Sequence, residues 1–202
     1  MRHLKRISEA EMIAVFLRTE LASSRIVPTI GDLVRRDGRD RSVISDPDLS
    51  NTADNVYRRR VLGAYRGYGR DAELFAGFPA IARWYHAIAT KDDLTRVRYI
   101  NYAYWNALSG GSRVPADAAA RIRQGIEVFN VSNTGFWHLT DAIAAGATFP
   151  EMIMVGARKG APLILVEGHA RLTAYFLRPE AIPSAMNVIV GYASDIAEWT
   201  LY

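Results

Sequence analysis

Hydrophobic positions recur with a helical period over most of residues 1–124. In the first such stretch, Ile13, Phe16 and Leu17 follow Ser8 and Glu11, which have the spacing of a capping box. Comparable signals, with Gly or Pro at the ends, recur along this part of the chain. We expect helices over 8–21, 29–37, 56–69, 71–77, 79–88 and 92–108 and from 115 onward, with Thr52 or Asp54 as the cap of the helix over 56–69. The polar stretch 36–55 is expected to be a surface loop, and the whole region is expected to be all-helical.

The pattern changes after residue 125. Short unbroken apolar runs predict buried strands over 152–155, 163–166 and 186–190. Helical spacing predicts helices over 137–145 and 169–178, with a last turn near 195–199. The fold class is therefore α+β, with a helical domain over 1–124 and a small mixed sheet with helices over 125–202.

Composition excludes several classes of function. The 202 residues include no cysteine, which excludes disulfides, thiolate catalysis and cysteine-bearing metal sites. The histidines His3, His86, His138 and His169 lack ligand spacing, so no metal site built by the protein alone is expected. No apolar run is long enough to span a bilayer, and the N-terminal residues contain no secretory apolar segment. We therefore expect a cytoplasmic protein without membrane contact.

Charge is distributed unevenly between the two regions. Residues 1–124 carry 21 Lys and Arg against 14 Asp and Glu, whereas residues 125–202 carry 4 against 7. Such a distribution suits an anionic ligand between the regions, or a nucleic acid on the first of them. The arginines from Arg58 to Arg70 are the densest basic cluster. They fit a solvated helix face, but Asn55 and Arg58 lie one turn apart and could point together into a cleft.

The stretch APLILVEGHARLTAYFL, residues 161–177, carries the strongest candidate chemistry. A buried strand switches to a helix at Glu167-Gly168-His169, and Arg171 follows within the first helical turn. A helix N-terminus presents unpaired N–H groups and a positive dipole end, so this turn suits an anion. The alternative is a structural connection without a ligand.

The order of residues here resembles the ParB/sulfiredoxin-like fold. The likeness covers about residues 130–192 and rests on LTDAIAAGATFPEMIMV, APLILVEGHARLTAYFL and AMNVIVGY in that order. The turn EGHAR is most similar to that of the free-serine kinases of this fold. Sulfiredoxins need a cysteine in the turn, and partitioning proteins carry a helix-turn-helix for which the 24 residues after Arg178 leave no room.

The resemblance implies a nucleotide site. Its phosphates would be held by Gly168, His169 and Arg171, with Glu167 at the mouth of the turn. The preceding segment of relatives supplies further polar contacts, which implies weaker roles for the residues in the same segment here, namely His138, Thr140 and Asp141.

Two functions follow as hypotheses. The first is a kinase-like phosphotransferase that takes ATP, ADP or CTP with Mg²⁺ and acts on a small-molecule substrate. Glu167 and His169 would be catalytic, and Asn55 and Arg58 would face the same cleft as Arg171. The second is a DNA-associated, ParB-like binding module without catalysis, in which Arg58 to Arg70 contact nucleic acid. A scaffold without a ligand is the third reading, and the oligomeric state stays open.

Overall fold

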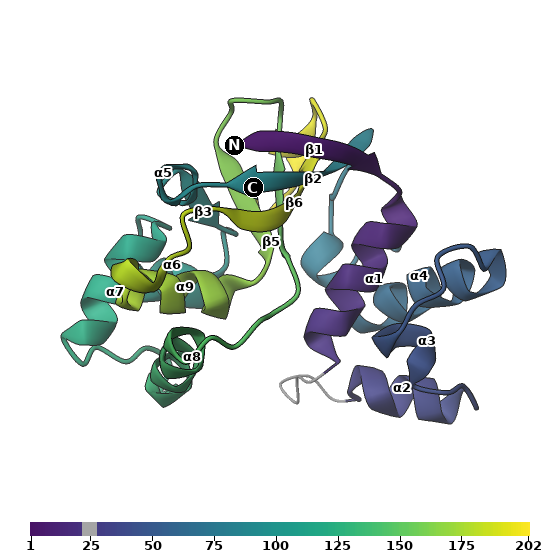
Figure 1. Ribbon diagram of the computed structural model, residues 1–202, viewed down its shortest axis with the longest axis horizontal. Helices are drawn as coiled ribbons and strands as arrows, with labels where there is room; N and C mark the ends of the chain where they lie inside the picture. Colours follow the sequence, from purple (N-terminus) through teal and green to yellow (C-terminus); the bar gives the residue numbers. More distant parts are fainter. Residues whose placement is uncertain (22–27) are drawn as a thin grey trace.

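Strands from both regions of the chain pair into one mixed sheet. The computed structural model describes residues 1–21 and 28–202, and its sheet has the order β1-β2-β6-β4-β5-β3 (Figure 1). The strands are β1 (Arg2–Ile7), β2 (Arg83–Ala89), β3 (Val97–Tyr99), β4 (Met152–Gly156), β5 (Leu163–Glu167) and β6 (Met186–Tyr192). β6 runs parallel to β4 and β3 parallel to β5, and the other neighbouring pairs are antiparallel. The α+β class is confirmed.

The three strands predicted from apolar runs are confirmed, because each run lies in the middle of the sheet. All residues of β4 and β5 are buried, as are Val188 to Gly191 of β6. A strand buried on both faces has no polar alternation, so it reads as a continuous apolar run.

The expectation of an all-helical region over 1–124 is wrong. This region supplies β1, β2 and β3, so the boundary at 124/125 does not separate a helical part from a sheet part. The segment predicted as a helix over 79–88 contains β2, where Trp84, Tyr85 and Ile88 match both a helical spacing and the aromatic and β-branched content of a strand. The sheet pairs β2 on both sides, with β1 and β6, and this tertiary pairing decides in favour of the strand.

The first group of helices surrounds α1. It comprises α1 (Glu9–Glu20), α2 (Ile30–Arg36), α3 (Ser42–Ser45) and α4 (Thr52–Arg66). The side chains of Ser8 and Thr29 cap α1 and α2 as predicted, whereas α4 is capped by Asn51. The helix predicted over 71–77 is a 3₁₀ turn, Glu73–Phe75, and the loop predicted over 36–55 contains α3.

The second group of helices packs around α9 (His169–Leu177), which contacts α7 (Pro115–Arg123) and α8 (Thr134–Ala144). The long helix predicted over 92–108 is instead α5 (Lys91–Leu94), β3 and α6 (Ala103–Leu108). Helix α9 reaches the sheet at β3, where the hydroxyl groups of Tyr99 and Thr173 are 2.6 Å apart. Short 3₁₀ turns at Pro179–Ala181 and Ile196–Glu198 complete the elements of this region.

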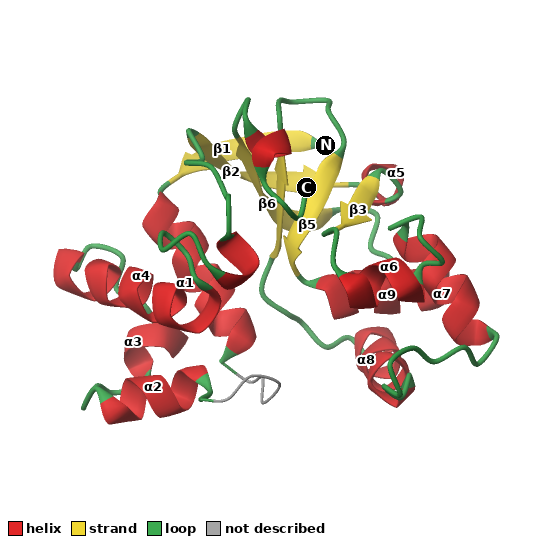
Figure 2. Ribbon diagram, turned by 180° about the vertical axis from the view of Figure 1, so that it is seen from behind, coloured by secondary structure: helices red, strands yellow, loops and turns green. Residues whose placement is uncertain are grey.

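The two groups of helices lie apart on either side of the space beneath the sheet, and this arrangement is the same from the front and from behind (Figure 1, Figure 2). One continuous set of buried apolar side chains nevertheless joins them through the sheet. Within the described ranges, no helix has the length and apolar character needed to cross a membrane.

Candidate functional site

Gly168 makes the turn between β5 and α9 possible. Its φ of +104° lies in the left-handed region that favours glycine. A Cβ placed there would lie 2.7 Å from Met152 Cγ and 3.1 Å from Arg171 Nη2. The glycine is therefore explained by the close packing of the turn against the start of β4.

Glu167 and Arg171 point into the protein. Their side chains are only 7% and 8% exposed, and Glu167 Oε1 lies 3.6 Å from Arg171 Nη2. Arg171 also donates a hydrogen bond to the backbone carbonyl of Pro150. Burial lowers the pKa of Arg171, and the negative charge of Glu167 opposes that shift. The pair ties the turn to the segment that leads into β4.

His169 is buried in a stack of aromatic rings. Its ring centroid lies 5.0 Å from that of Trp105 and 5.9 Å from that of Tyr99, with both pairs stacked. Its backbone carbonyl accepts a hydrogen bond of 2.8 Å from the Thr173 hydroxyl. The side chain thus lies between α9, α6 and β3, and its surroundings are aromatic.

The three candidates on α8 have different environments. Thr140 is buried and donates a hydrogen bond of 2.8 Å to the carbonyl of Phe136, as a helix-packing hydroxyl does. Asp141 is exposed and lies 3.3 Å from Arg178 Nη2. His138 is also exposed. The structure does not gather these three side chains around the turn.

Asn55 and Arg58 lie in the other group of helices. The Arg58 side chain is fully buried, and its guanidinium donates hydrogen bonds of 2.9 Å to the carbonyls of Val43 and Asp48, and a further one to Asn55 Oδ1. The amide of Asn55 in turn donates to Leu49 O at 2.8 Å. The expectation that Arg58 shares a cleft with Arg171 is wrong, because its donors are used to fix the loop around α3.

Two further arginines of α4 are held by carboxylates of α1. Arg59 Nη1 lies 2.5 Å from Glu9 Oε2, and Arg66 Nη2 lies 3.9 Å from Glu20 Oε1. Both guanidinium groups therefore lie against α1, in the other group of helices from residues 167–171.

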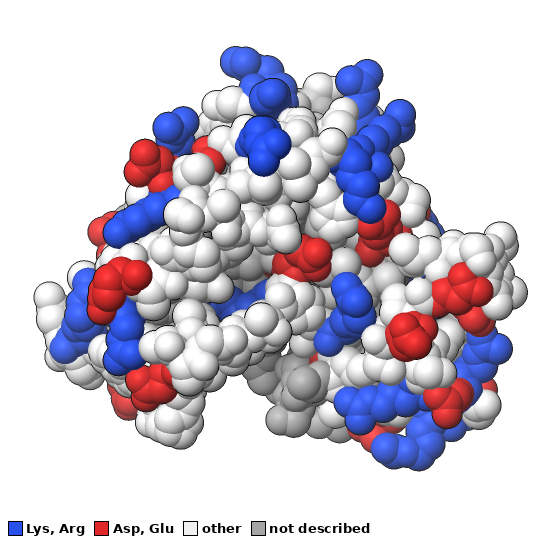
Figure 3. Space-filling view, viewed as in Figure 1, with Lys and Arg blue, Asp and Glu red and all other residues white. Residues whose placement is uncertain are grey.

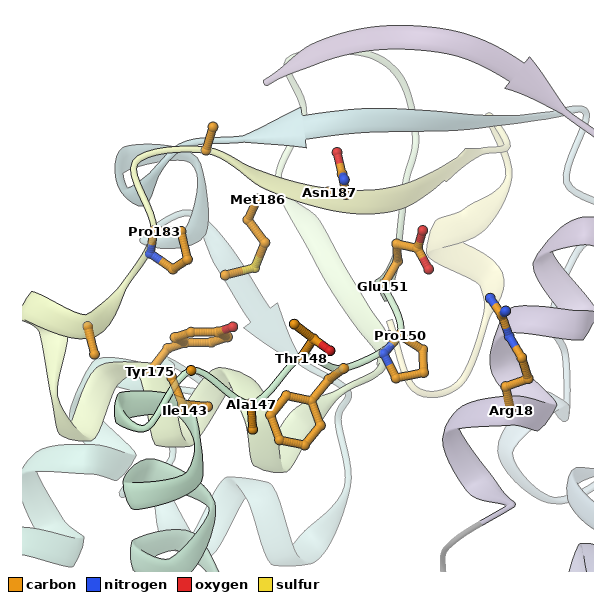
Figure 4. A pocket seen from close by; sticks show the side chains of 14 residues that line it. Arg18, Ile143, Ala147, Thr148, Pro150, Glu151, Tyr175, Pro183, Met186 and Asn187 are labelled. Atoms are coloured by element: carbon orange, nitrogen blue, oxygen red, sulfur yellow. The ribbon is translucent and has the colours of Figure 1, made fainter. Parts of the chain in front are cut away.

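A cavity opens between the two groups of helices. It has a volume of about 750 Å³ and lies where the molecular surface is hollowed in Figure 3. Its apolar side chains come from α8, α9, the segments before β4 and β6 and the start of β6, and its polar ones from α1, the segment before β4 and the start of β6 (Figure 4). The apolar ones include Ile143, Phe149, Pro150, Tyr175, Pro183 and Met186, and the polar ones are Arg18, Thr148, Glu151 and Asn187. We call this space the central cavity.

Arg18 is the only arginine or lysine that lines the central cavity among the described residues. Its Nε atom is buried and has no hydrogen-bond partner, and the guanidinium forms no ion pair with the part of the chain that the structure describes. In Figure 4 the side chain reaches from α1 toward Glu151 on the opposite wall. A partly buried cation without a partner is costly, so an anion would satisfy it.

Glu151 lies close to a histidine of β2. Glu151 Oε1 lies 4.0 Å from Nδ1 of His86 on β2, and Nε2 of the same ring lies 2.8 Å from Glu11 Oε1 on α1. The carboxylate at the cavity wall therefore belongs to a chain of three polar groups that spans α1, β2 and the start of β4.

Arg171 connects the buried turn to the central cavity. Pro150, whose carbonyl accepts from Arg171, lines the cavity, and so does Tyr175 one turn further along α9. Burial raises the pKa of Tyr175, and the positive charge of Arg171 opposes this shift. The charge of Arg171 thus lies behind the cavity wall and acts on the side chains that line it.

Among residues 1–21 and 28–202, no three His, Asp or Glu side chains come together in a group that could hold a metal ion. Mg²⁺ in nucleotide sites commonly uses one or two carboxylates together with phosphate oxygens. Glu151 fits that pattern. Glu167 does not, because it is buried against Arg171.

Reasoning from the sequence did not identify Arg18, Glu151 or Tyr175 as site residues. Arg18 had a usable signal, since it is a lone cation directly after the apolar run from Met12 to Leu17. The other two had none, because the cavity forms only when α1, α9 and the segment before β4 come together. The chain matches no protein-family model, no curated protein and no solved structure.

Proposed function

We propose that the protein binds a small anionic ligand of the nucleotide class in the central cavity. The observation that carries this proposal is the guanidinium of Arg18, which has no ion pair within residues 1–21 and 28–202 and lies at one end of a cavity whose other end is apolar and aromatic. A nucleotide has matching parts, since its base is planar and weakly polar and its phosphates are anionic.

The dimensions and the composition of the central cavity support this class of ligand. Sites for small molecules commonly measure 300–1,000 Å³ and combine apolar walls with a few polar groups. Tyr175 and Phe149 offer rings against which a base could stack, and Met186 offers a polarisable apolar contact. Arg18 offers forked donors for a phosphate oxygen pair.

In this proposal the turn at 167–171 positions the site and does not touch the ligand. Glu167 and Arg171 hold Pro150, Gly168 allows the close packing against Met152, and His169 anchors α9 between aromatic rings. Residues assigned to phosphate contact by the resemblance to the ParB/sulfiredoxin-like fold thereby take a supporting role.

Phosphoryl transfer is the catalytic extension of the proposal. A bound nucleotide would supply the phosphoryl group, and Mg²⁺ would neutralise charge on its phosphates. In this chain, Glu151 is the carboxylate in the central cavity that could hold the metal ion or accept a proton from a substrate hydroxyl. His86, supported by Glu11, would keep that carboxylate oriented.

Calorimetric titration of the wild type and of Arg18→Ala with ATP, ADP and CTP, each with Mg²⁺, tests the proposal. Loss of one charge-assisted fork is worth about 1.5–3 kcal/mol, so Arg18→Ala should bind roughly ten- to a hundredfold more weakly. Arg178→Ala is the matched control, because Arg178 is an exposed arginine nearby that pairs with Asp141 outside the cavity. Equal affinities for all three proteins, or no heat with any nucleotide, would refute the proposal.

A further inference from the structure

Three aromatic rings cluster on the face of the sheet where β1, β2 and β6 run side by side. The rings of His3 and Tyr85 are stacked with centroids 4.6 Å apart, and that of Tyr192 lies 5.5 Å from His3. His3 Nε2 and the Tyr192 hydroxyl are also 3.0 Å apart, which fixes the group. All three side chains remain partly exposed.

Positive side chains surround this aromatic cluster. Arg6 is paired with Tyr85 across β1 and β2, and Arg83 is paired with Tyr192 across β2 and β6. Directly opposite residues in a sheet lie on the same face, so both arginines lie on the face of the rings. Lys159, in the connection between β4 and β5, is close enough for its charge to lower the pKa of His3, although burial lowers it more.

Within the described part of the chain, these cations have no acidic partner. Arg6, Arg83 and Lys159 are exposed, and none of them forms an ion pair with any residue whose position is described. The edge of the molecule that carries β1 in Figure 1 accordingly shows mostly Lys and Arg in Figure 3. We call the six residues His3, Arg6, Arg83, Tyr85, Lys159 and Tyr192 the aromatic–basic surface.

We propose that the aromatic–basic surface binds single-stranded nucleic acid, with bases against its rings and phosphates against its arginines and lysine. Sheet faces that bind single strands combine aromatic platforms with a positive surround, because every base has a face that stacks and every linkage carries a charge. An acidic peptide would match the charges but would leave the aromatic cluster without a partner of its own kind.

The arginines of α4 are less suited to bind nucleic acid, because they are buried or already paired with carboxylates. Arg58 is buried, Arg59 and Arg66 are paired with Glu9 and Glu20, and Arg60 Nη2 donates to Asp37 at 3.1 Å. Counterion release requires cations that are free to meet phosphates, and those on α4 already have carboxylate neighbours.

The test is a fluorescence anisotropy titration with a labelled oligothymidylate of about 15 nucleotides at several salt concentrations. We expect binding that weakens with salt, and a slope of log K against log salt that falls by about 0.7 for each cation removed in Arg83→Ala and Lys159→Ala. Tyr85→Leu should lose about tenfold in affinity at constant salt, whereas Tyr85→Phe, which keeps the ring, should bind like the wild type.

Arg60→Ala is the matched control, since it removes an exposed arginine from α4, and thermal melting establishes that each variant is folded. No binding at low salt would overturn the inference. So would equal losses for Arg60→Ala and Arg83→Ala, or equal affinity for a duplex of the same length. Arg18→Ala should bind the oligonucleotide normally, so that failure of the cavity proposal and failure of this inference are separate results.

Discussion

The arginines of α4 and the arginine of α1 lie in the same group of helices but have opposite environments. Arg58 donates hydrogen bonds within the protein through both terminal nitrogens, and Arg59 and Arg66 have carboxylate partners, whereas Arg18 has no ion pair among the residues described. The dense cluster in the sequence therefore serves folding, and the isolated residue at the cavity is the one left to meet a ligand. Density of charge along a chain is a weaker guide to binding than the absence of a partner in the fold.

The largest expected effect comes from replacing Arg58. Arg58→Met keeps the apolar stem of the side chain but leaves the carbonyls of Val43 and Asp48 without donors. Because these are charge-assisted bonds in a buried site, unfolding free energy should fall by about 3–5 kcal/mol. Urea unfolding measures this as a lower midpoint at unchanged m-value.

Arg60→Met is its control, because Arg60 is 60% exposed and its contacts, an ion pair with Asp37 and a cation–π contact with Tyr57, lie at the surface. Exposed ion pairs contribute about 0–1 kcal/mol, so this variant should be close to the wild type. Equal destabilisation of the two variants would remove the contrast between a structural and a solvated arginine on α4.

The buried turn should respond to mutation through stability, whereas the central cavity should respond through ligand affinity. Gly168→Ala should cost about 2–3 kcal/mol, because the new Cβ would meet Met152 and the backbone would be held at a strained positive φ. Thermal unfolding should show this as a clear loss in Tm. Full stability together with a selective loss of nucleotide affinity would instead make the turn a direct ligand contact.

The smallest expected change in unfolding free energy is an increase, and it comes from replacing Arg18. Arg18→Met should stabilise the free protein by about 1 kcal/mol, since it removes a buried Nε donor that lacks a partner and keeps the apolar stem. The same variant should lose nucleotide affinity, because the guanidinium that destabilises the free protein is the group proposed to bind the phosphate. Loss of stability would show that Arg18 has a structural role, and the cavity would then lack its best anion contact.

The predictability of the fold differed along the chain for a physical reason. Strands β4, β5 and β6 are buried on both faces, so each contains an apolar run that predicts it from the local sequence alone. Strand β1 is mostly polar, only Ile7 at its end is buried, and it lies at an edge of the sheet, so it has no such signal. Strand β2 has residues that suit either secondary structure, and only its pairing with two neighbours decides between them.

The candidate site was predictable only in part for a related reason. The strand, glycine and helix at 163–177 were found where they were expected, because a glycine between an apolar run and a helical pattern is a local signal. The direction of Glu167 and Arg171 was not predictable. Whether a charged side chain faces a ligand or a neighbouring carbonyl depends on segments far away in sequence, here Pro150.

The position of β6 in the sheet has a consequence for how the chain folds during synthesis. β6 lies between β2 and β4 and is hydrogen-bonded to both, so among the described strands it alone joins the β1–β2 pair to the rest of the sheet. A ribosome must reach residue 192 before strands made about a hundred residues earlier can join that sheet. Contacts so distant in sequence slow folding, and until then the β2 edge is open to pairing with other chains.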